Sequence, residues 1–195
     1  MRFAVRSVGS ILLATALLAV SGCASLREPA PRAPRCVGTD VHAFDFWIGE
    51  WDIAQRIRTA DGDWIELPAH TSVSVSPDRC VLIEHWDGEV QFFWEGMAAP
   101  EALVGFSVRT FDPAIRAWRI YWLDSRHPAF DAPYVGAFEN GRGEFRREID
   151  TPAGRRSARI VFSDIGANSL EWALETSADG GASWTPLWRM SMRRR

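Results

Sequence analysis

Three polar residues interrupt otherwise apolar, alternating stretches of the sequence and could do acid–base chemistry: Glu84, Asp124 and Tyr121. In an extended strand, residues of one parity face the same side. If the apolar parity faces inward, Glu84 and Asp124 lie in an apolar pocket, which would raise the pKa of each carboxyl and suit a proton donor or acceptor. The alternative is that these carboxylates hydrogen-bond Arg109 or Arg119 on neighbouring strands, or face solvent.

Such a site predicts a cofactor-free isomerase, cyclase or lyase that acts on an apolar substrate. The sequence has no nucleophile elbow and no phosphate-binding loop. No pair of histidines shares a strand face with a carboxylate between them, so we expect no metal site. We expect no cofactor either; haem held through His85 or His127 is the alternative.

The elements that must position these groups are short strands. Alternating or apolar segments recur along the chain and are separated by turn signals such as Asp61-Gly62, Asp87-Gly88 and Asn140-Gly141. This pattern predicts an all-β fold, an up-and-down antiparallel β-barrel of about ten strands with a short helical turn before the first; a β-sandwich is the alternative. The expected strands are 51–59, 64–76, 81–86, 90–95, 103–111, 117–124, 134–139, 143–150, 157–162, 170–176 and 184–192.

The chain contains 10 tryptophans, and several of them share one parity of an expected strand. Aromatic stripes of this kind either fill a core or form the walls of an apolar pocket, because large barrels leave interior volume unfilled. The tryptophans expected to bind a ligand are Trp86, Trp118, Trp122 and Trp172.

The first 22 residues resemble a bacterial lipoprotein signal. Two arginines precede a short apolar stretch that ends in Val20-Ser21-Gly22-Cys23, which places Cys23 as the lipidated first residue of the mature chain. Ala24 follows the cysteine, and by Gram-negative sorting this favours the periplasmic face of the outer membrane. The expected organisation is a signal peptide over 1–22, a Pro/Arg-rich tether over 23–42 and a β-barrel domain over 43–195.

Charge and cysteine content narrow the range of partners. The net charge is -3, and removal of the signal with its two arginines makes the mature chain more acidic, so we expect no nucleic-acid partner. Cys36 and Cys80 are an even pair in an oxidising compartment, which predicts a disulfide. A chain of this length folds without an oligomer, so we expect a monomer.

The stretch 44–52, Phe-Asp-Phe-Trp-Ile-Gly-Glu-Trp-Asp, begins the resemblance of this chain to a family of secreted bacterial domains of unknown function. Further parts of the pattern are residues 80–86, Phe111-Asp112-Pro113 followed by Trp118, and the hairpin at 177–184. The resemblance implies a lipocalin-like or nitrobindin-like (calycin) barrel and no established activity. It also implies that Gly49 allows a tight entry into the first strand, that Trp51 plugs the barrel end, and that Arg189 stacks on Trp51.

The sequence therefore predicts a membrane-anchored lipoprotein whose barrel binds a small apolar or amphipathic molecule. We expect a binding protein rather than an enzyme. The alternatives are an enzyme that uses the carboxylates named above, and a structural envelope protein whose barrel is packed with side chains.

Overall fold

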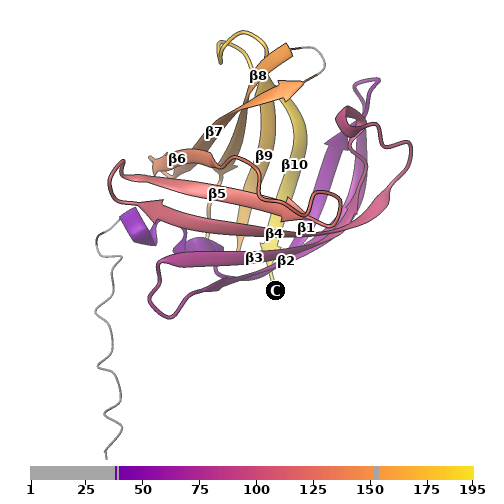
Figure 1. Cartoon of the computed structure of the whole chain (residues 1–195). Coiled ribbons are helices and arrows are strands. Elements are labelled where there is room, and N and C mark those ends of the chain that lie inside the picture. The colour runs from indigo at the N-terminus through magenta and orange to yellow at the C-terminus, as the bar shows by residue number, and fades with distance from the viewer. Residues whose placement is uncertain (1–37, 39, 152–153) are drawn as a thin grey trace, which may run out of the picture. The chain divides into compact units, whose positions relative to one another are not determined.

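The barrel is formed by ten antiparallel strands joined in sequence order, and the first strand pairs with the last to close it (Figure 1). The computed structural model describes residues 38, 40–151 and 154–195. The strands are β1 (Gly49–Arg58), β2 (Trp64–Val75), β3 (Val81–Val90), β4 (Glu101–Asp112), β5 (Ala117–Asp124), β6 (Tyr134–Glu139), β7 (Arg142–Thr151), β8 (Gly154–Ser163), β9 (Ser169–Ser177) and β10 (Thr185–Arg194). The predicted barrel is confirmed.

Burial alternates along the strands, most clearly in β1. In β1, every second residue from Trp51 to Ile57 is buried and the residues between them are exposed. One side of each strand thus faces a shared interior, which is rich in large apolar side chains. Closure leaves no unpaired strand edge between β1 and β10.

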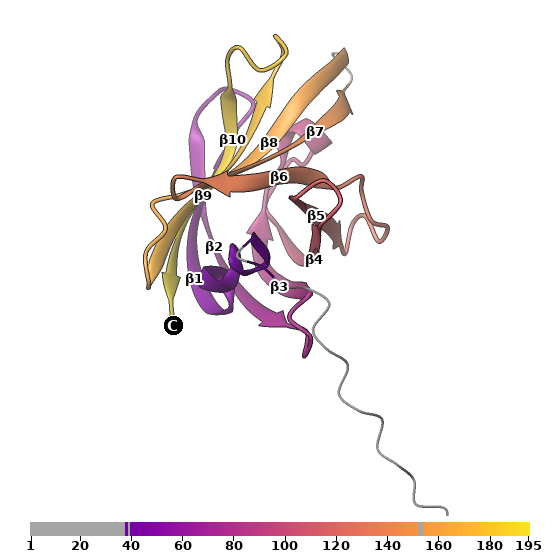
Figure 2. The ribbon, with the colours of Figure 1, turned by 90° about the vertical axis from the view of Figure 1, so that its left-hand side faces the viewer.

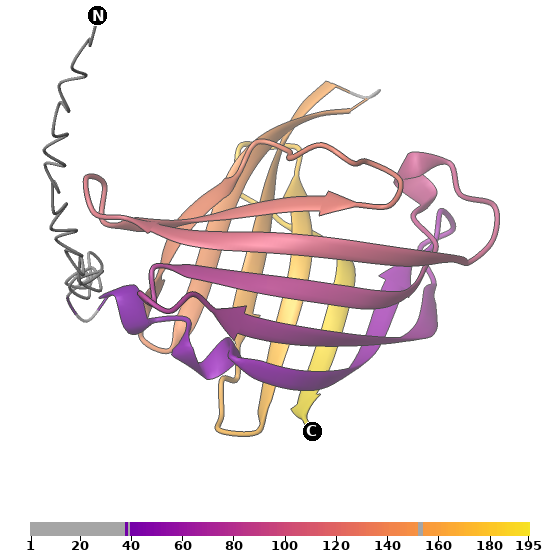
Figure 3. The same cartoon turned by 60° about the horizontal axis from the view of Figure 1, so that its bottom comes forward.

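Two short 3-10 helices, η1 (Asp40–His42) and η2 (Asp45–Trp47), form a floor at one end of the barrel. Figure 2 looks toward this end and shows both helices within the ring of strands. The helical turn predicted before the first strand is η2. Phe44, between the two helices, is fully buried, with its ring edge-on to the rings of Trp118 and Phe162. A third 3-10 helix, η3 (Phe93–Glu95), lies at the opposite end (Figure 3).

The prediction that Arg189 stacks on Trp51 is wrong. Inward-facing residues of β10 have the parity of Met190 and Met192, and Arg189 has the opposite parity, so it lies outside over the Trp64 ring. Arg194 has the inward parity, pairs with Trp51 across the β1–β10 seam and places its guanidinium carbon 4.3 Å from the centre of that ring.

Gly49 is required where the floor meets β1. Its φ is +126°, and a Cβ built there would lie 2.5 Å from Nη1 of Arg194. The same guanidinium donates to the carbonyl oxygens of Ile48 at 2.6 Å and Phe46 at 2.7 Å. The predicted roles of Gly49 and Trp51 in closing the barrel thus agree with the structure, with Arg194 as their partner.

One predicted turn and one predicted strand are also wrong. Asp87 and Gly88 continue β3 in register with His70 and Ala69 of β2, so the chain does not turn there. The segment expected as a strand over 90–95 instead contains η3. The barrel therefore has ten strands where the sequence suggested eleven segments.

No helix among residues 38, 40–151 and 154–195 is long and apolar enough to cross a membrane. The predicted signal peptide, the lipidated Cys23 and the disulfide partner Cys36 lie outside the described residues. Lipidation and the Cys36–Cys80 disulfide therefore stay predictions.

Candidate functional site

The barrel encloses a cavity of about 330 Å³. Its deep end lies above the floor, against Trp47, and its outer end reaches the loop after β5. The mouth is at the end of the barrel where η3 lies. His127 and Asp131 line the cavity there, and their side chains are 61% and 52% exposed. Its tryptophans are Trp47, Trp86, Trp94, Trp122, Trp172 and Trp188.

Three of the four tryptophans predicted to bind a ligand line this cavity: Trp86, Trp122 and Trp172. Trp118 does not. It is four positions before Trp122 along β5, which is roughly 13 Å of strand. It therefore lies in the floor, and its Nε1 donates to the carbonyl oxygen of Asp40 at 3.0 Å. The prediction that Trp118 contacts a ligand is therefore wrong.

Trp188 lies at the centre of the aromatic wall, although it was not among the tryptophans expected to bind a ligand. The centre of its ring lies 5.8 Å from that of Trp86 and 5.3 Å from that of Trp172, both edge-on. Its Nε1 donates to Oε1 of Gln55, a buried residue of β1, at 2.7 Å. This bond fixes the ring and leaves its face for packing.

Trp122 reaches over β4 at Gly105, which is the register partner of Asp124 and has no side chain. A Cβ on Gly105 would lie 2.2 Å from the Trp122 ring. The Nε1 of Trp122 donates to Oδ2 of Asp124 at 2.8 Å. The ring thus lies close to the β4 backbone and forms part of the cavity wall.

Glu84 forms a buried ion pair with Arg109 inside the barrel. Arg109 Nη2 donates to Glu84 Oε2 at 2.7 Å, and the two side chains are only 4% and 7% exposed. Ser107 also donates to Oε2, at 2.8 Å, and Thr71 donates to Oε1 at 3.0 Å. Of the two readings of Glu84 from sequence, hydrogen bonding to Arg109 is confirmed.

Arg109 is held by rings as well as by its carboxylate. Its guanidinium carbon lies 4.8 Å from the centre of the Trp47 ring, 5.0 Å from that of Phe44 and 5.7 Å from that of Phe162. Burial lowers the pKa of Arg109 below its usual range, and the adjacent Glu84 opposes this shift. A guanidinium with so high an ordinary pKa remains charged at neutral pH, so the pair is a cation and an anion with no net charge.

Asp124 lines the cavity, and its carboxylate binds backbone groups of the loop that follows β5. Its Oδ1 accepts from the backbone N–H groups of Arg126 at 2.8 Å and His127 at 2.9 Å, while Oδ2 accepts from Trp122. These bonds cap the turn at the cavity mouth. The expected arginine partner of Asp124 is absent among the described residues.

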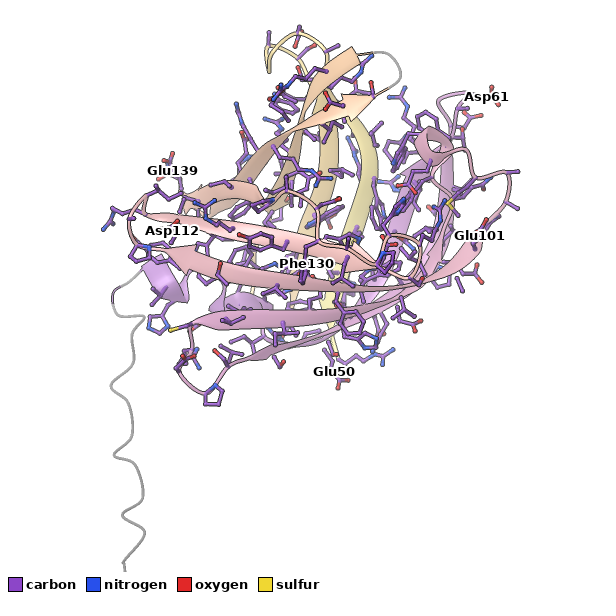
Figure 4. The ribbon with its side chains drawn as sticks, viewed as in Figure 1. Glu50, Asp61, Glu101, Asp112, Phe130 and Glu139 are labelled. Atoms are coloured by element: carbon purple, nitrogen blue, oxygen red, sulfur yellow. The ribbon has the colours of Figure 1, made fainter. Side chains whose placement is uncertain are left out.

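Tyr121 does not belong to this site. It has the outward parity of β5, and its ring contacts that of Phe130 at 6.0 Å. Phe130 lies on the outer side of the barrel and is 55% exposed (Figure 4). The prediction of Tyr121 as a catalytic candidate beside the two carboxylates is therefore wrong.

Two loops meet across the mouth of the cavity. Nη1 of Arg126, in the loop after β5, donates to Glu95 of η3 at 2.7 Å. Arg147, Asp131 and Tyr134 also line the cavity. Nη1 of Arg147 donates to Asp131 at 3.0 Å, and the guanidinium carbon of Arg147 lies 4.5 Å from the centre of the Tyr134 ring. Burial raises the pKa of Tyr134, so its hydroxyl stays protonated at neutral pH.

The two histidines considered as haem ligands lie in different environments. His85 lies on the outer face of β3, where it stacks on Phe106 with ring centres 4.9 Å apart, so it cannot reach the cavity. His127 lines the mouth. Among the described residues, no three His, Cys, Asp or Glu side chains cluster closely enough to hold a metal ion.

Comparison with known proteins bears on the fold. No protein-family model and no curated protein sequence matches this chain. Among solved structures, the chain is similar to the S-type phycobiliprotein lyase CPES from Guillardia theta, with a TM-score of 0.52 and 9% identity over 78% of this chain and 90% of the lyase. It is also similar to Rv2717c from M. tuberculosis, with a TM-score of 0.51 and 11% identity over 82% of this chain and 99% of that one. At these identities the likeness shows the fold alone. That fold is consistent with the calycin-like barrel expected from the sequence.

Proposed function

We propose that the barrel binds one small apolar or amphipathic molecule in its cavity. The observation that carries the proposal is the unfilled interior of about 330 Å³ above the floor formed by η1 and η2. Protein interiors otherwise pack at the density of organic crystals, and ligand pockets begin at roughly 300 Å³ with mostly apolar and aromatic walls. A structural protein with a packed barrel is not compatible with such a cavity.

Binding is favoured over catalysis because Glu84 and Asp124, the two carboxylates considered for acid–base chemistry, are already engaged. Glu84 and Asp124 each accept three hydrogen bonds from the protein. The oxygens of both carboxylates are thus engaged by donors of the protein itself. We therefore assign these residues to holding Arg109 and the mouth loop in place.

We also propose that Cys23 carries a lipid anchor that holds the barrel at the periplasmic face of the outer membrane. The support is the sequence around this cysteine. Labelling with tritiated palmitate in a Gram-negative host should mark the wild-type chain and not Cys23→Ala. Recovery of label on the variant, or of unlabelled wild type in the inner membrane, would contradict the proposal.

Calorimetric titration of the full chain in detergent with 2-isopropylnaphthalene tests binding. An apolar cavity of about 150 Å³ holds benzene, so the larger cavity here accommodates two fused rings with a short substituent. We expect saturable binding of one molecule per chain. Trp172→Leu should weaken it about tenfold, because an aromatic pair contributes about 0.5–1.5 kcal/mol beyond its buried area.

Trp64→Leu is the matched control. Trp64 lies on the outer face between Arg56 and Arg189, so this substitution should leave the affinity within about twofold of wild type, as expected of a residue outside the pocket. Equal loss in both variants, or no saturable heat with wild type, would refute binding in the cavity. Native mass spectrometry and an absorbance scan of protein from its own membrane would reveal a co-purifying ligand, including haem.

A further inference from the structure

Trp47 and Arg109, at the deep end of the cavity, carry several N–H groups that have no acceptor. Nε1 of Trp47 and both Nε and Nη1 of Arg109 are buried and find no hydrogen-bond partner among the residues that the structure describes. Trp47 is 2% exposed and Arg109 is 3% exposed. The two side chains touch each other and both line the cavity.

No oxygen among residues 38, 40–151 and 154–195 accepts a hydrogen bond from these donors. The carboxylate of Glu84, which is closest, is shared among Thr71, Ser107 and Nη2 of Arg109. The rings around the guanidinium offer only π faces, which are weak acceptors. A buried N–H group without an acceptor destabilises the protein. A ligand oxygen that accepts from such a group therefore gains more binding free energy than one placed beside N–H groups that already have acceptors.

Charge decides which kind of oxygen fits. Arg109 is already neutralised by Glu84. The cavity as a whole is lined by four carboxylates and two guanidinium groups: Glu84, Glu95, Asp124, Asp131, Arg109 and Arg147. A ligand carboxylate would add a further negative charge to a buried site without a free cation, and the desolvation of such a charge is not repaid. A carbonyl oxygen brings two lone pairs and no charge.

We propose that the ligand is a neutral, flat molecule, aromatic or conjugated, whose carbonyl oxygen accepts hydrogen bonds from Arg109 and Trp47. Its apolar body lies among the tryptophans nearer the mouth, where flat rings pack edge-on and face-on. This inference rests on the proposed function, since it names the class of ligand for the same cavity.

Three naphthalenes with substituents of similar size test it: 2-acetylnaphthalene, 2-isopropylnaphthalene and 2-naphthoate. The ketone presents a neutral hydrogen-bond acceptor to the site, the isopropyl compound presents no acceptor, and the carboxylate presents an anionic acceptor. In calorimetric titrations of the full chain in detergent, the ketone should bind about tenfold more tightly than the hydrocarbon, which is the gain from pairing a buried donor. The carboxylate should bind most weakly.

Trp47→Phe removes one of the donors and keeps an aromatic ring in the floor, so the preference for the ketone over the hydrocarbon should fall severalfold. Trp86→Phe is the control: its Nε1 is likewise buried and unpaired, yet it lies in the wall rather than beside Arg109. It should weaken both ligands and keep their ratio. Partition into detergent is the same for every protein and cancels in this comparison of ratios.

An infrared difference spectrum of ¹³C-carbonyl 2-acetylnaphthalene on the wild-type protein gives a readout that needs no variant. The bound carbonyl stretch should lie below its position in hexane, as expected of an oxygen that accepts hydrogen bonds. An unshifted band would overturn the proposal.

The outcomes separate this inference from the proposed function. If none of the three molecules binds, the proposed function itself fails. If all bind but the ketone gains nothing over the hydrocarbon, water molecules satisfy the donors and only this inference fails. Tightest binding of the naphthoate would refute the charge argument. Loss of the preference in Trp86→Phe rather than Trp47→Phe would refute the position of the carbonyl.

Discussion

Replacing Arg109 by Met should destabilise the barrel strongly, because it leaves the charge of Glu84 buried with only two hydroxyl donors. Breaking a buried pair by removing one partner costs about 3–5 kcal/mol, out of a total stability of about 5–15 kcal/mol for a typical domain. At about 2–4 °C per kcal/mol for a chain of this size, the midpoint of thermal unfolding should fall by about 6–20 °C.

The double variant Glu84→Leu/Arg109→Met should recover most of this loss, since apolar residues of similar volume can replace a buried ion pair at little cost. Urea unfolding followed by tryptophan fluorescence gives all the free energies of the cycle. Arg119→Met is the matched control, because the Arg119–Asp112 pair is partly exposed and hydrated. A single variant at Arg109 as stable as this control, or a double variant no better than the single one, would refute the reasoning.

Three further expectations concern the floor, the mouth and the last hairpin. Gly49→Ala should lower the free energy of unfolding, measured with urea, by about 1–3 kcal/mol, because the positive φ and the adjacent guanidinium both oppose a Cβ. Gly166→Ala should lower it much less, because a Cβ there meets only ordinary contacts. Arg126→Gln removes the ion pair to Glu95 across the mouth, so stopped-flow measurements should show faster release of 2-acetylnaphthalene, and an unchanged rate would exclude a role for this pair in gating. Hydrogen bonds from serine hydroxyl and backbone groups hold the pKa of Asp179 well below its usual range, so its contribution to stability is present above the unfolded pKa and is lost as the pH falls. Asp179→Asn should therefore lower the thermal midpoint at pH 7, and the difference from wild type should shrink between about pH 4 and pH 2; a constant difference across that range would contradict this.

Parity along the strands could be predicted from the sequence, and most of the site follows from it. Glu84, Trp86, Trp122 and Asp124 face the interior as expected, because the two-residue period of a strand is a local property. The same rule would have placed Arg194 rather than Arg189 inside, had the inward parity of β10 been extended to the end of the chain. Tyr121 failed as a candidate for this reason, since it has the opposite parity to its neighbour Trp122.

Position along the barrel axis was harder to predict, because it depends on where each strand begins relative to the floor. Trp118 and Trp122 have the same parity, yet one packs under the cavity and the other lines it. Asp87-Gly88 is a common turn dipeptide, but pairing with β2 and β4 on both sides keeps this segment extended. Here tertiary hydrogen bonding overrides the local preference.

The sequence by itself determined the all-β class, the aromatic interior and the glycine entry into the first strand, since each depends on local periodicity and backbone freedom. Only the tertiary structure decided that Glu84 meets Arg109, that Arg194 seals the floor, and that a cavity remains above Trp47 with N–H groups left to satisfy. These features depend on the register of strands distant in sequence and on the volume that their side chains leave empty, and neither quantity is set by any local stretch of residues.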